Sequence, residues 1–123
     1  MSTVINRILV VDWCARITRE TIDRLHADNL ACKANIQQAQ ARVARDGRRY
    51  IGIAVGGGMR YFIDKRTGLI HPSASWKTPN LKRSFGTLAT VADFNWGNYE
   101  AVAKPGTPWK METLRHYQTA VPV

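Results

Sequence analysis

The stretch RYIGIAVGGGMRYFID, residues 49–64, decides the fold class of this 123-residue chain. Along residues 49–55, isoleucine and valine side chains fall on one face and only glycine and alanine lie opposite them, a pattern typical of a β-strand. The triple glycine at 56–58 turns the chain, and residues 59–64 alternate again. The stretch therefore predicts an antiparallel β-hairpin.

The residues after this hairpin extend the predicted sheet. Residues 64–68 form a tight turn in this interpretation, with Gly68 where a left-handed backbone is needed, and residues 69–71 follow as a third strand. Two successive hairpins predict a meander. We therefore assign residues 49–103 to an antiparallel β-core and residues 104–123 to a Pro-containing C-terminal tail.

Residues 1–48 are predicted to hold a short strand and one long helix. The apolar run in residues 4–11 indicates the strand, while Thr18 suits the N-cap of the helix and Gly47 its C-terminal cap. The apolar stripe of the helix recurs every three or four residues and consists of Ile22, Leu25, Asn29, Cys32, Ile36, Ala39 and Val43. The prediction for the whole chain is a single α+β domain, with a long N-terminal helix packed on a small antiparallel sheet.

The predicted helix is too long for the domain that it belongs to. A helix of about 28 residues spans roughly 42 Å, whereas the remaining residues form a body only about 25 Å across. Either the helix breaks near Asp28 and Asn29, or its far half packs against another copy of the chain. We favour helix-assisted homo-oligomerisation over an intramolecular helical hairpin, because a polar residue such as Asn29 in an apolar stripe often fixes the choice of partner.

The charge of the chain is strongly positive and unevenly distributed. Eighteen Lys and Arg residues against nine Asp and Glu give a net charge of +9, and residues 49–86 hold seven basic residues against Asp64 alone. A positive potential of this kind attracts phosphates. We expect nucleic acid or a small nucleotide as the partner, and the alternative is a basic surface that serves only solubility.

Several other classes of function are disfavoured. The apolar runs fall short of the roughly 20 residues that a membrane span needs, and no signal peptide opens the chain, so we expect no membrane partner and a cytosolic location. Cys14 and Cys32 form no CxxC pair and the three histidines lie 45 residues apart, so we expect reduced thiols, no metal and no cofactor. We also expect no enzyme, because no nucleophile stands with an oriented base.

Residues 76–96 combine three ingredients of a nucleotide-binding site. An aromatic ring stacks on a base, a cation neutralises a phosphate, and an asparagine amide offers both a donor and an acceptor. The segment contains the aromatics Trp76, Phe85, Phe94 and Trp96, the cations Lys77, Lys82 and Arg83, and the amides of Asn80 and Asn95. Phe94 and Trp96 fit a core position equally well, whereas Phe85, between Ser84 and Gly86, suits the edge of a pocket.

Three short motifs resemble one known family. Residues 60–64 (RYFID) with Gly68, residues 82–88 (KRSFGTL) and residues 93–96 (DFNW) are similar to motifs of the phage anti-Thoeris sponge proteins, the first Thoeris anti-defence family. The resemblance implies a viral protein in the host cytoplasm that binds a cyclic ADP-ribose isomer, made by TIR-domain defence proteins, and holds it without cleavage. It also implies a fold in which a helix lies across an antiparallel β-core. Members of the family form dimers with the ligand pocket at the subunit interface, and these dimers assemble into hexamers. Some members have a separate site for cyclic oligonucleotides.

The same resemblance implies roles for three residues, with Phe85 as the pocket aromatic, Asn95 as the pocket amide and Arg60 as the basic contact. Our leading hypothesis is that Phe85 stacks on the adenine and Asn95 binds a ribose or a base edge. In this hypothesis Arg60, together with Lys82 or Arg83, binds the pyrophosphate. We therefore expect these five side chains to line one ligand pocket.

Two other functions remain open at this point. A small RNA- or DNA-binding protein would use the basic sheet and its aromatics as a platform for a single strand, and a structural phage protein would assemble through its helix. We rank nucleic acid below the cyclic nucleotide as a partner. Salt distinguishes these two, because binding of a polymer falls steeply as counterions are released, whereas binding of an enclosed diphosphate responds weakly.

Overall fold

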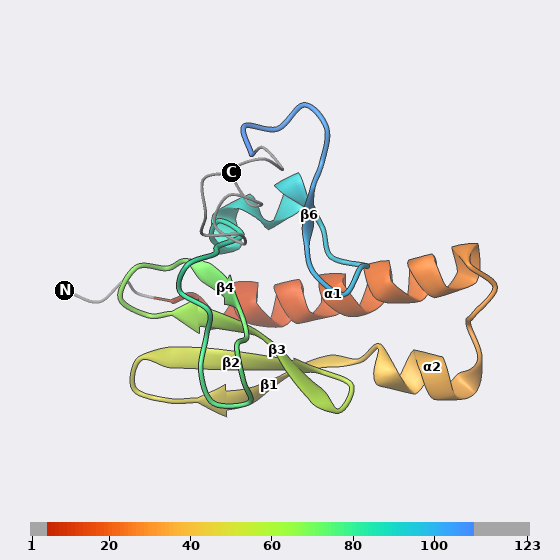
Figure 1. The fold of residues 1–123 in the computed structure, drawn as a ribbon, viewed down its shortest axis with the longest axis horizontal. Coiled ribbons are helices and arrows are strands. Elements are labelled where there is room, and N and C mark those ends of the chain that lie inside the picture. Colours follow the sequence, from red (N-terminus) through yellow and green to blue (C-terminus); the bar gives the residue numbers. More distant parts are fainter. Residues whose placement is uncertain (1–4, 110–123) are drawn as a thin grey trace, which may run out of the picture.

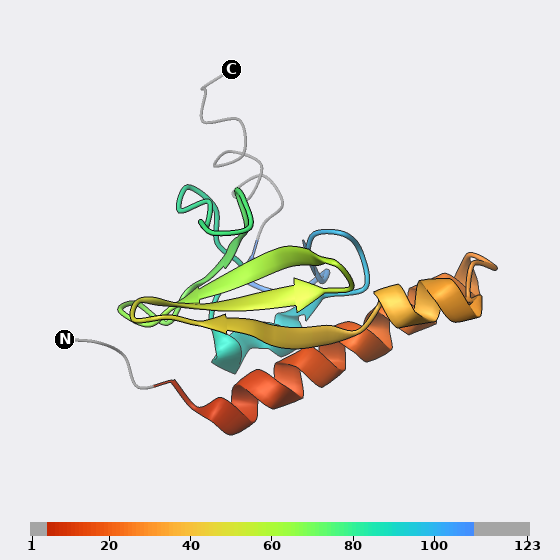
Figure 2. The same cartoon turned by 90° about the horizontal axis from the view of Figure 1, so that it is seen from below.

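One long helix lies against one face of a four-stranded antiparallel sheet in the computed structural model, which describes residues 5–109 (Figures 1 and 2). The helices are α1 (Arg7–Ala27), α2 (Lys33–Gln38) and the 3₁₀ helix η1 (Leu88–Asp93). The sheet has the order β1-β2-β3-β4 and consists of β1 (Ala41–Asp46), β2 (Tyr50–Val55), β3 (Gly58–Asp64) and β4 (Ile70–Pro72). A separate ladder pairs β5 (Phe94–Asn95) with β6 (Val102–Ala103). The predicted α+β class and the meander are confirmed, and most of the predicted tail lies outside the described residues.

Helix α1 begins where the sequence predicted a strand. Asn6 caps the helix, because its Oδ1 accepts hydrogen bonds from the backbone N atoms of Ile8 at 2.9 Å and Leu9 at 3.4 Å. The buried side chains recur with helical spacing and are Val10, Trp13, Cys14, Ile17, Thr21 and Leu25. The predicted strand is therefore wrong, since the apolar run that suggested it supplies part of an amphipathic helix. Residue 4 of that run lies outside the described residues.

Helix α1 ends at Ala27, so of the two alternatives left open for the long helix, the structure shows the break near Asp28 and Asn29. Asn29 has a φ of 57°, a left-handed conformation that asparagine tolerates better than most residues. The backbone N of Leu30 donates to the carbonyl of Leu25 at 2.7 Å, a bond typical of a closed helix end. The predicted continuous helix to residue 46 is wrong, because only the short α2 follows before the chain enters the sheet.

Residues 41–46 pair with β2 instead of extending a helix. The register runs from Ala41 opposite Val55 to Asp46 opposite Ile51, with a bulge between Val43 and Arg45. Pairing satisfies backbone hydrogen-bonding groups along one side of the strand, and such tertiary contacts override a weak helical preference. β1 is consequently the edge strand of the sheet, and all its residues after Ala41 are exposed.

The core lies between α1, the inner face of the sheet and residues 85–101. The ring of Trp13 on α1 lies 5.5 Å from that of Tyr61 and 5.1 Å from that of Trp96, measured between centroids. Phe94 and Trp96 are fully buried, so the interpretation of both as core residues is confirmed. The inner face of the sheet completes the core with Ile51, Ile53, Val55, Ile63 and Ile70.

The opposite face of the sheet carries a loop, residues 73–82, which we name the strap (Figure 2). Ser73 fixes its start, because its backbone N donates to the carbonyl of Arg60 at 3.0 Å and its Oγ to the carbonyl of Met59 at 2.8 Å. Further along, the backbone N of Asn80 donates to the carbonyl of Pro72 at 2.8 Å. The strap is thus held at both ends of its turn.

Candidate functional site

A tight turn at the tip of the strap presents an aromatic and a cationic side chain to solvent. Ser75 Oγ accepts hydrogen bonds from the backbone N atoms of Lys77 and Thr78, each at 3.2 Å, and lies 2.8 Å from Thr78 Oγ1. Serine hydroxyls stabilise turns in this way. Trp76, inside this turn, is 50% exposed, and Lys77 is exposed as well.

Arg45 connects the tip of the strap to the edge strand β1. Its Nη1 donates to the backbone carbonyl of Lys77 at 3.4 Å. A guanidinium has five N–H donors, and within residues 5–109 the others on Arg45 make no further hydrogen bond to protein. The turn therefore places the half-exposed ring of Trp76 next to two cations that remain open to a ligand.

Positive charge extends around this tip. Residues 41–82 contain nine Lys and Arg residues against only Asp46 and Asp64. Arg48, Lys77 and Lys82 are exposed, and none of the three makes an ion pair within the part of the chain that the structure describes. We name the exposed side chains of Arg45, Arg48, Trp76, Lys77 and Lys82 the strap surface.

The two carboxylates of this region are already neutralised by other cations. Asp46 lies 2.7 Å from Lys65 Nζ and 2.8 Å from Arg7 Nη1. The hydrogen bond from Lys65, with a smaller contribution from Arg7, holds the pKa of Asp46 below its usual value. Asp64 is buried and lies 3.4 Å from Arg49 Nη2. The positive potential of the strap surface is therefore not cancelled by its nearest carboxylates.

Phe85, the predicted stacking residue, lies in the core. It is 0% exposed, and its ring packs edge-to-face against the rings of Tyr61 at 5.9 Å, Phe94 at 6.1 Å and Trp96 at 6.2 Å. A nucleotide cannot stack on a ring that other aromatics enclose. The predicted role of Phe85 is wrong for this chain, because its aromatic neighbours in the sequence fold into the same cluster.

The two cations predicted beside Phe85 differ in burial. Arg83 is buried, forms an ion pair with Glu100 and lies over the Phe85 ring, with 5.6 Å between its Cζ and the ring centre. The carbonyl of Arg83 is also 2.6 Å from Nδ1 of the buried His71. These contacts stabilise the fold, and the burial of Arg83 keeps its guanidinium away from a phosphate in solution, although its Nε makes no hydrogen bond. Lys82 is exposed and belongs to the strap surface.

Arg60 lies beside a small hollow on another part of the molecule. It has no pairing partner in β2, because β3 contains a bulge between Met59 and Tyr61. Bulges redirect a side chain, and the Cζ of Arg60 lies 4.5 Å from the centre of the Tyr99 ring. Arg60 and Tyr99 both line a hollow of about 180 Å³.

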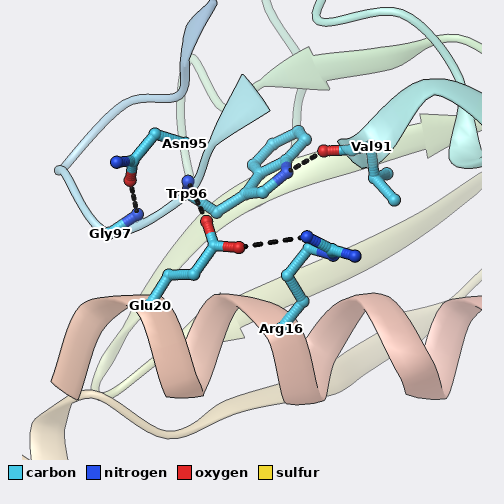
Figure 3. A network of polar contacts seen from close by, with 6 residues as sticks. All are labelled: Arg16, Glu20, Val91, Asn95, Trp96 and Gly97. Carbon is cyan, nitrogen blue, oxygen red and sulfur yellow. Dashed lines mark hydrogen bonds and ion pairs between the residues drawn. The ribbon is translucent and has the colours of Figure 1, made fainter. Parts of the chain in front are cut away.

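Asn95 lines a second hollow, of about 310 Å³, and the two hollows adjoin at Arg24. The amide of Asn95 already has a structural role, since its Oδ1 accepts a hydrogen bond from the backbone N of Gly97 at 2.8 Å (Figure 3). The Nε of Arg24 donates to the carbonyl of the same Gly97 at 2.6 Å. Arg60 and Asn95 therefore line two different hollows, which share Arg24.

The segment that carries Asn95 is fixed to α1 by one carboxylate (Figure 3). Glu20 accepts a hydrogen bond from the backbone N of Trp96 at 2.8 Å and forms an ion pair with Arg16 at 3.2 Å. The Nε1 of Trp96 donates to the carbonyl of Val91 at 2.8 Å. This network positions the wall of both hollows.

The five predicted residues thus do not form one site. Arg60 and Asn95 line two hollows that share Arg24, Lys82 lies on the strap, and Arg83 and Phe85 are buried. Sequence reasoning missed Arg45 because residues 41–46 were assigned to a helix. The local sequence contains little signal for this strand, because ARVARD alternates only over its first three residues.

Compared with family models, with curated proteins and with solved structures, the chain matches none. Within residues 5–109, no three His, Cys, Asp or Glu side chains are grouped so as to hold a metal ion. The helices of that part of the chain are too short or too polar to cross a membrane. The site is therefore interpreted from its own geometry alone.

Proposed function

We propose that this protein binds single-stranded nucleic acid on the strap surface. The observation that carries the proposal is the half-exposed Trp76 on a hydrogen-bonded turn, fixed by Arg45 and flanked by Lys77. Stacking of a base on an aromatic ring contributes about 1–3 kcal/mol and tolerates any base. Lysine and arginine neutralise the phosphates on either side of that base.

The openness of the strap surface favours a polymer over an enclosed small ligand. Its exposed cations come from β1, the β1–β2 turn and the strap, and a single strand offers several phosphates to such a group of charges. A small cyclic nucleotide would leave most of them unused. The sequence analysis ranked a cyclic nucleotide above nucleic acid as the partner. We reverse that ranking, because Phe85, the ring expected to stack on the cyclic nucleotide, is buried.

Fluorescence anisotropy with labelled oligo-dT and oligo-U tests the proposal. We expect Trp76→Ala to weaken binding about five- to 150-fold, the equivalent of one lost stack, and Trp76→Phe to restore most of the affinity. Leu81→Ala, a matched change of another exposed apolar residue on the strap, should leave the affinity unchanged. Wild-type protein that binds neither oligonucleotide would contradict the proposal.

Sequestration of a cyclic ADP-ribose isomer is the second candidate. The observation that favours it is that Arg60 and Asn95 line hollows which adjoin at Arg24. The test is to incubate the protein with an extract of cells that make the TIR signal, denature it by heat and search for an intact cyclic nucleotide by mass spectrometry. Release of an intact cyclic nucleotide from wild-type protein but not from Arg60→Ala would support sequestration. Wild-type protein that releases no cyclic nucleotide would reject it.

Helix α1 also supplies a surface for self-association. Beside its buried stripe it carries a second apolar stripe, which consists of Ile8, Val11, Ala15 and Ile22 and has heptad-like spacing. Most of this stripe borders a hollow of about 580 Å³ between α1 and β1. Asp12 and Arg19 lie two turns apart on one flank, so an antiparallel second copy of α1 would pair each with its opposite charge.

We propose that a second copy of the chain covers this stripe. Sedimentation equilibrium should give the mass of a dimer for wild-type protein and of a monomer for Val11→Glu. Gln37→Glu, an equal charge change on the exposed side of α2, serves as the control and should remain dimeric. Wild-type protein that stays monomeric at high concentration would contradict self-association.

A further inference from the structure

The hollow beside Arg60 contains a buried hydroxyl group without a partner. Thr21, on α1, is 7% exposed, and its Oγ1 makes no hydrogen bond within the described structure. Burial of an unpaired hydroxyl costs stability, and such groups are rare in folded proteins. Thr21 lines the hollow, so a ligand there would supply the missing partner.

The rim of the same hollow offers a stacking surface. Tyr99 is 72% exposed although its ring lies 4.5 Å from the Arg60 guanidinium, so most of its surface remains available. An arginine that contacts a tyrosine ring also holds that ring in place. The pair is therefore a preformed platform for a flat ligand.

Besides Arg24 and Arg60, two neutral amides from the α2 region line the hollow. Asn35 uses its Nδ2 to donate to the carbonyl of Leu30 at 2.7 Å, which leaves its Oδ1 as an acceptor. Gln38 makes no side-chain hydrogen bond within residues 5–109. Together with the Thr21 hydroxyl, these groups provide both donors and acceptors, as the edge of a nucleobase requires.

The hollow is large enough for one aromatic ring system. An engineered cavity of about 150 Å³ holds a benzene molecule, and this hollow measures about 180 Å³. We infer that this hollow binds a single nucleobase, with its face on Tyr99 and its edge on Thr21, Asn35 and Gln38. This inference rests on the proposed function, because the base in the hollow is part of a bound strand or nucleotide.

Isothermal titration with AMP, CMP, GMP, UMP, adenosine and ribose 5-phosphate tests the hollow directly. We expect adenosine and at least one mononucleotide to bind, and ribose 5-phosphate, which has no base, not to bind. Tyr99→Ala should weaken binding about five- to 150-fold, and Tyr99→Phe should retain it. Thr21→Val, which has nearly the same shape, should weaken binding about five- to tenfold without lowering the melting temperature.

Two results would overturn the inference. The first is that no nucleoside or mononucleotide binds, and the second is that ribose 5-phosphate binds as well as AMP, which would indicate an anion site. Oligonucleotide anisotropy separates this inference from the proposed function. Loss of strand binding in Trp76→Ala but not in Tyr99→Ala would show that the strand does not use the hollow, which would then bind free nucleotides only, whereas the reverse would reject the strap surface and support the hollow.

Discussion

The guanidinium of Arg45 lies 3.4 Å from the backbone carbonyl of Lys77, so the edge strand of the sheet contacts the tip of the strap directly. The two residues are 32 positions apart in the sequence, and only the pairing of β1 with β2 brings them together. This contact holds Arg45 against the turn that carries Trp76 and Lys77. The candidate nucleic-acid surface therefore depends on β1 being a strand.

The buried position of Phe85 predicts a loss of stability when its ring is removed. Phe85→Ala should lower the free energy of unfolding by about 3–5 kcal/mol, because it deletes a fully enclosed aromatic side chain. Leu81→Ala, a change of an exposed residue nearby, should change it by less than about 0.5 kcal/mol. Urea denaturation measures both. Unchanged stability in Phe85→Ala would mean that this ring is not part of the core.

Glu20 is expected to matter for stability although it lies on a helix surface. Glu20→Ala removes the acceptor of the Trp96 backbone N and the partner of Arg16, so it should cost about 1–3 kcal/mol (Figure 3). Asp23→Ala removes a carboxylate one turn further along α1 that makes no such bonds, and should be nearly neutral. Equal melting temperatures for the two variants would contradict this role of Glu20.

The sequence predicted the central hairpins but not the elements that depend on distant contacts. Strict alternation over residues 49–64 has one interpretation, and β2 and β3 match it. Residues 41–46 have no clear strand pattern, and they are a strand because they pair with β2, a distant contact that no local pattern contains. Likewise, Asn6 and the spacing of Trp13 and Ile17 were compatible with a helix, but the short apolar run favoured a strand.

The candidate site shows the same limit. Residues 76–96 were correctly identified as rich in aromatic and basic side chains, but composition does not say which rings are buried. Phe85, Phe94 and Trp96 form one cluster, and only Trp76 stays half exposed, because the turn at Ser75 carries it away from the core. Tyr99 entered no prediction as a ligand residue, since its contact with Arg60 spans 39 positions of sequence.

The two cysteines should react at very different rates. Burial raises the pKa of the Cys14 thiol to about 11, so almost none of it is thiolate at neutral pH. Cys32 is exposed. Titration of the native protein with a thiol-reactive dye at pH 7.5 should label one thiol quickly and the second only after denaturation. Rapid labelling of both thiols would show that the helix–sheet contact around Cys14 opens readily.

The ion pairs of Asp46 predict a specific pH dependence. The hydrogen bond from Lys65 is the main cause that lowers the pKa of Asp46 in the folded protein. The ionised carboxylate therefore stabilises the fold above the unfolded-state pKa near 3.8, and this stabilisation is lost as the pH falls through the folded-state pKa. Asp46→Asn should therefore destabilise the protein at pH 6 and have little effect at pH 2–3. The carboxylate is exposed, so the difference should be below about 1 kcal/mol. Equal destabilisation by Asp46→Asn at both pH values, measured by urea denaturation, would contradict the linkage.

The salt dependence of single-strand binding tests the proposed function most directly. Affinity for labelled oligo-dT, measured by anisotropy across a salt series, should fall linearly on a log–log plot, because each neutralised phosphate releases counterions. Lys77→Ala should weaken binding and make the slope shallower by about 0.7, the value for one phosphate contact on a single strand. Lys104→Ala, which removes an exposed lysine outside the strap surface, should leave the slope unchanged. Affinity that does not change with salt, or a slope that Lys77→Ala leaves intact, would contradict nucleic-acid binding at this surface.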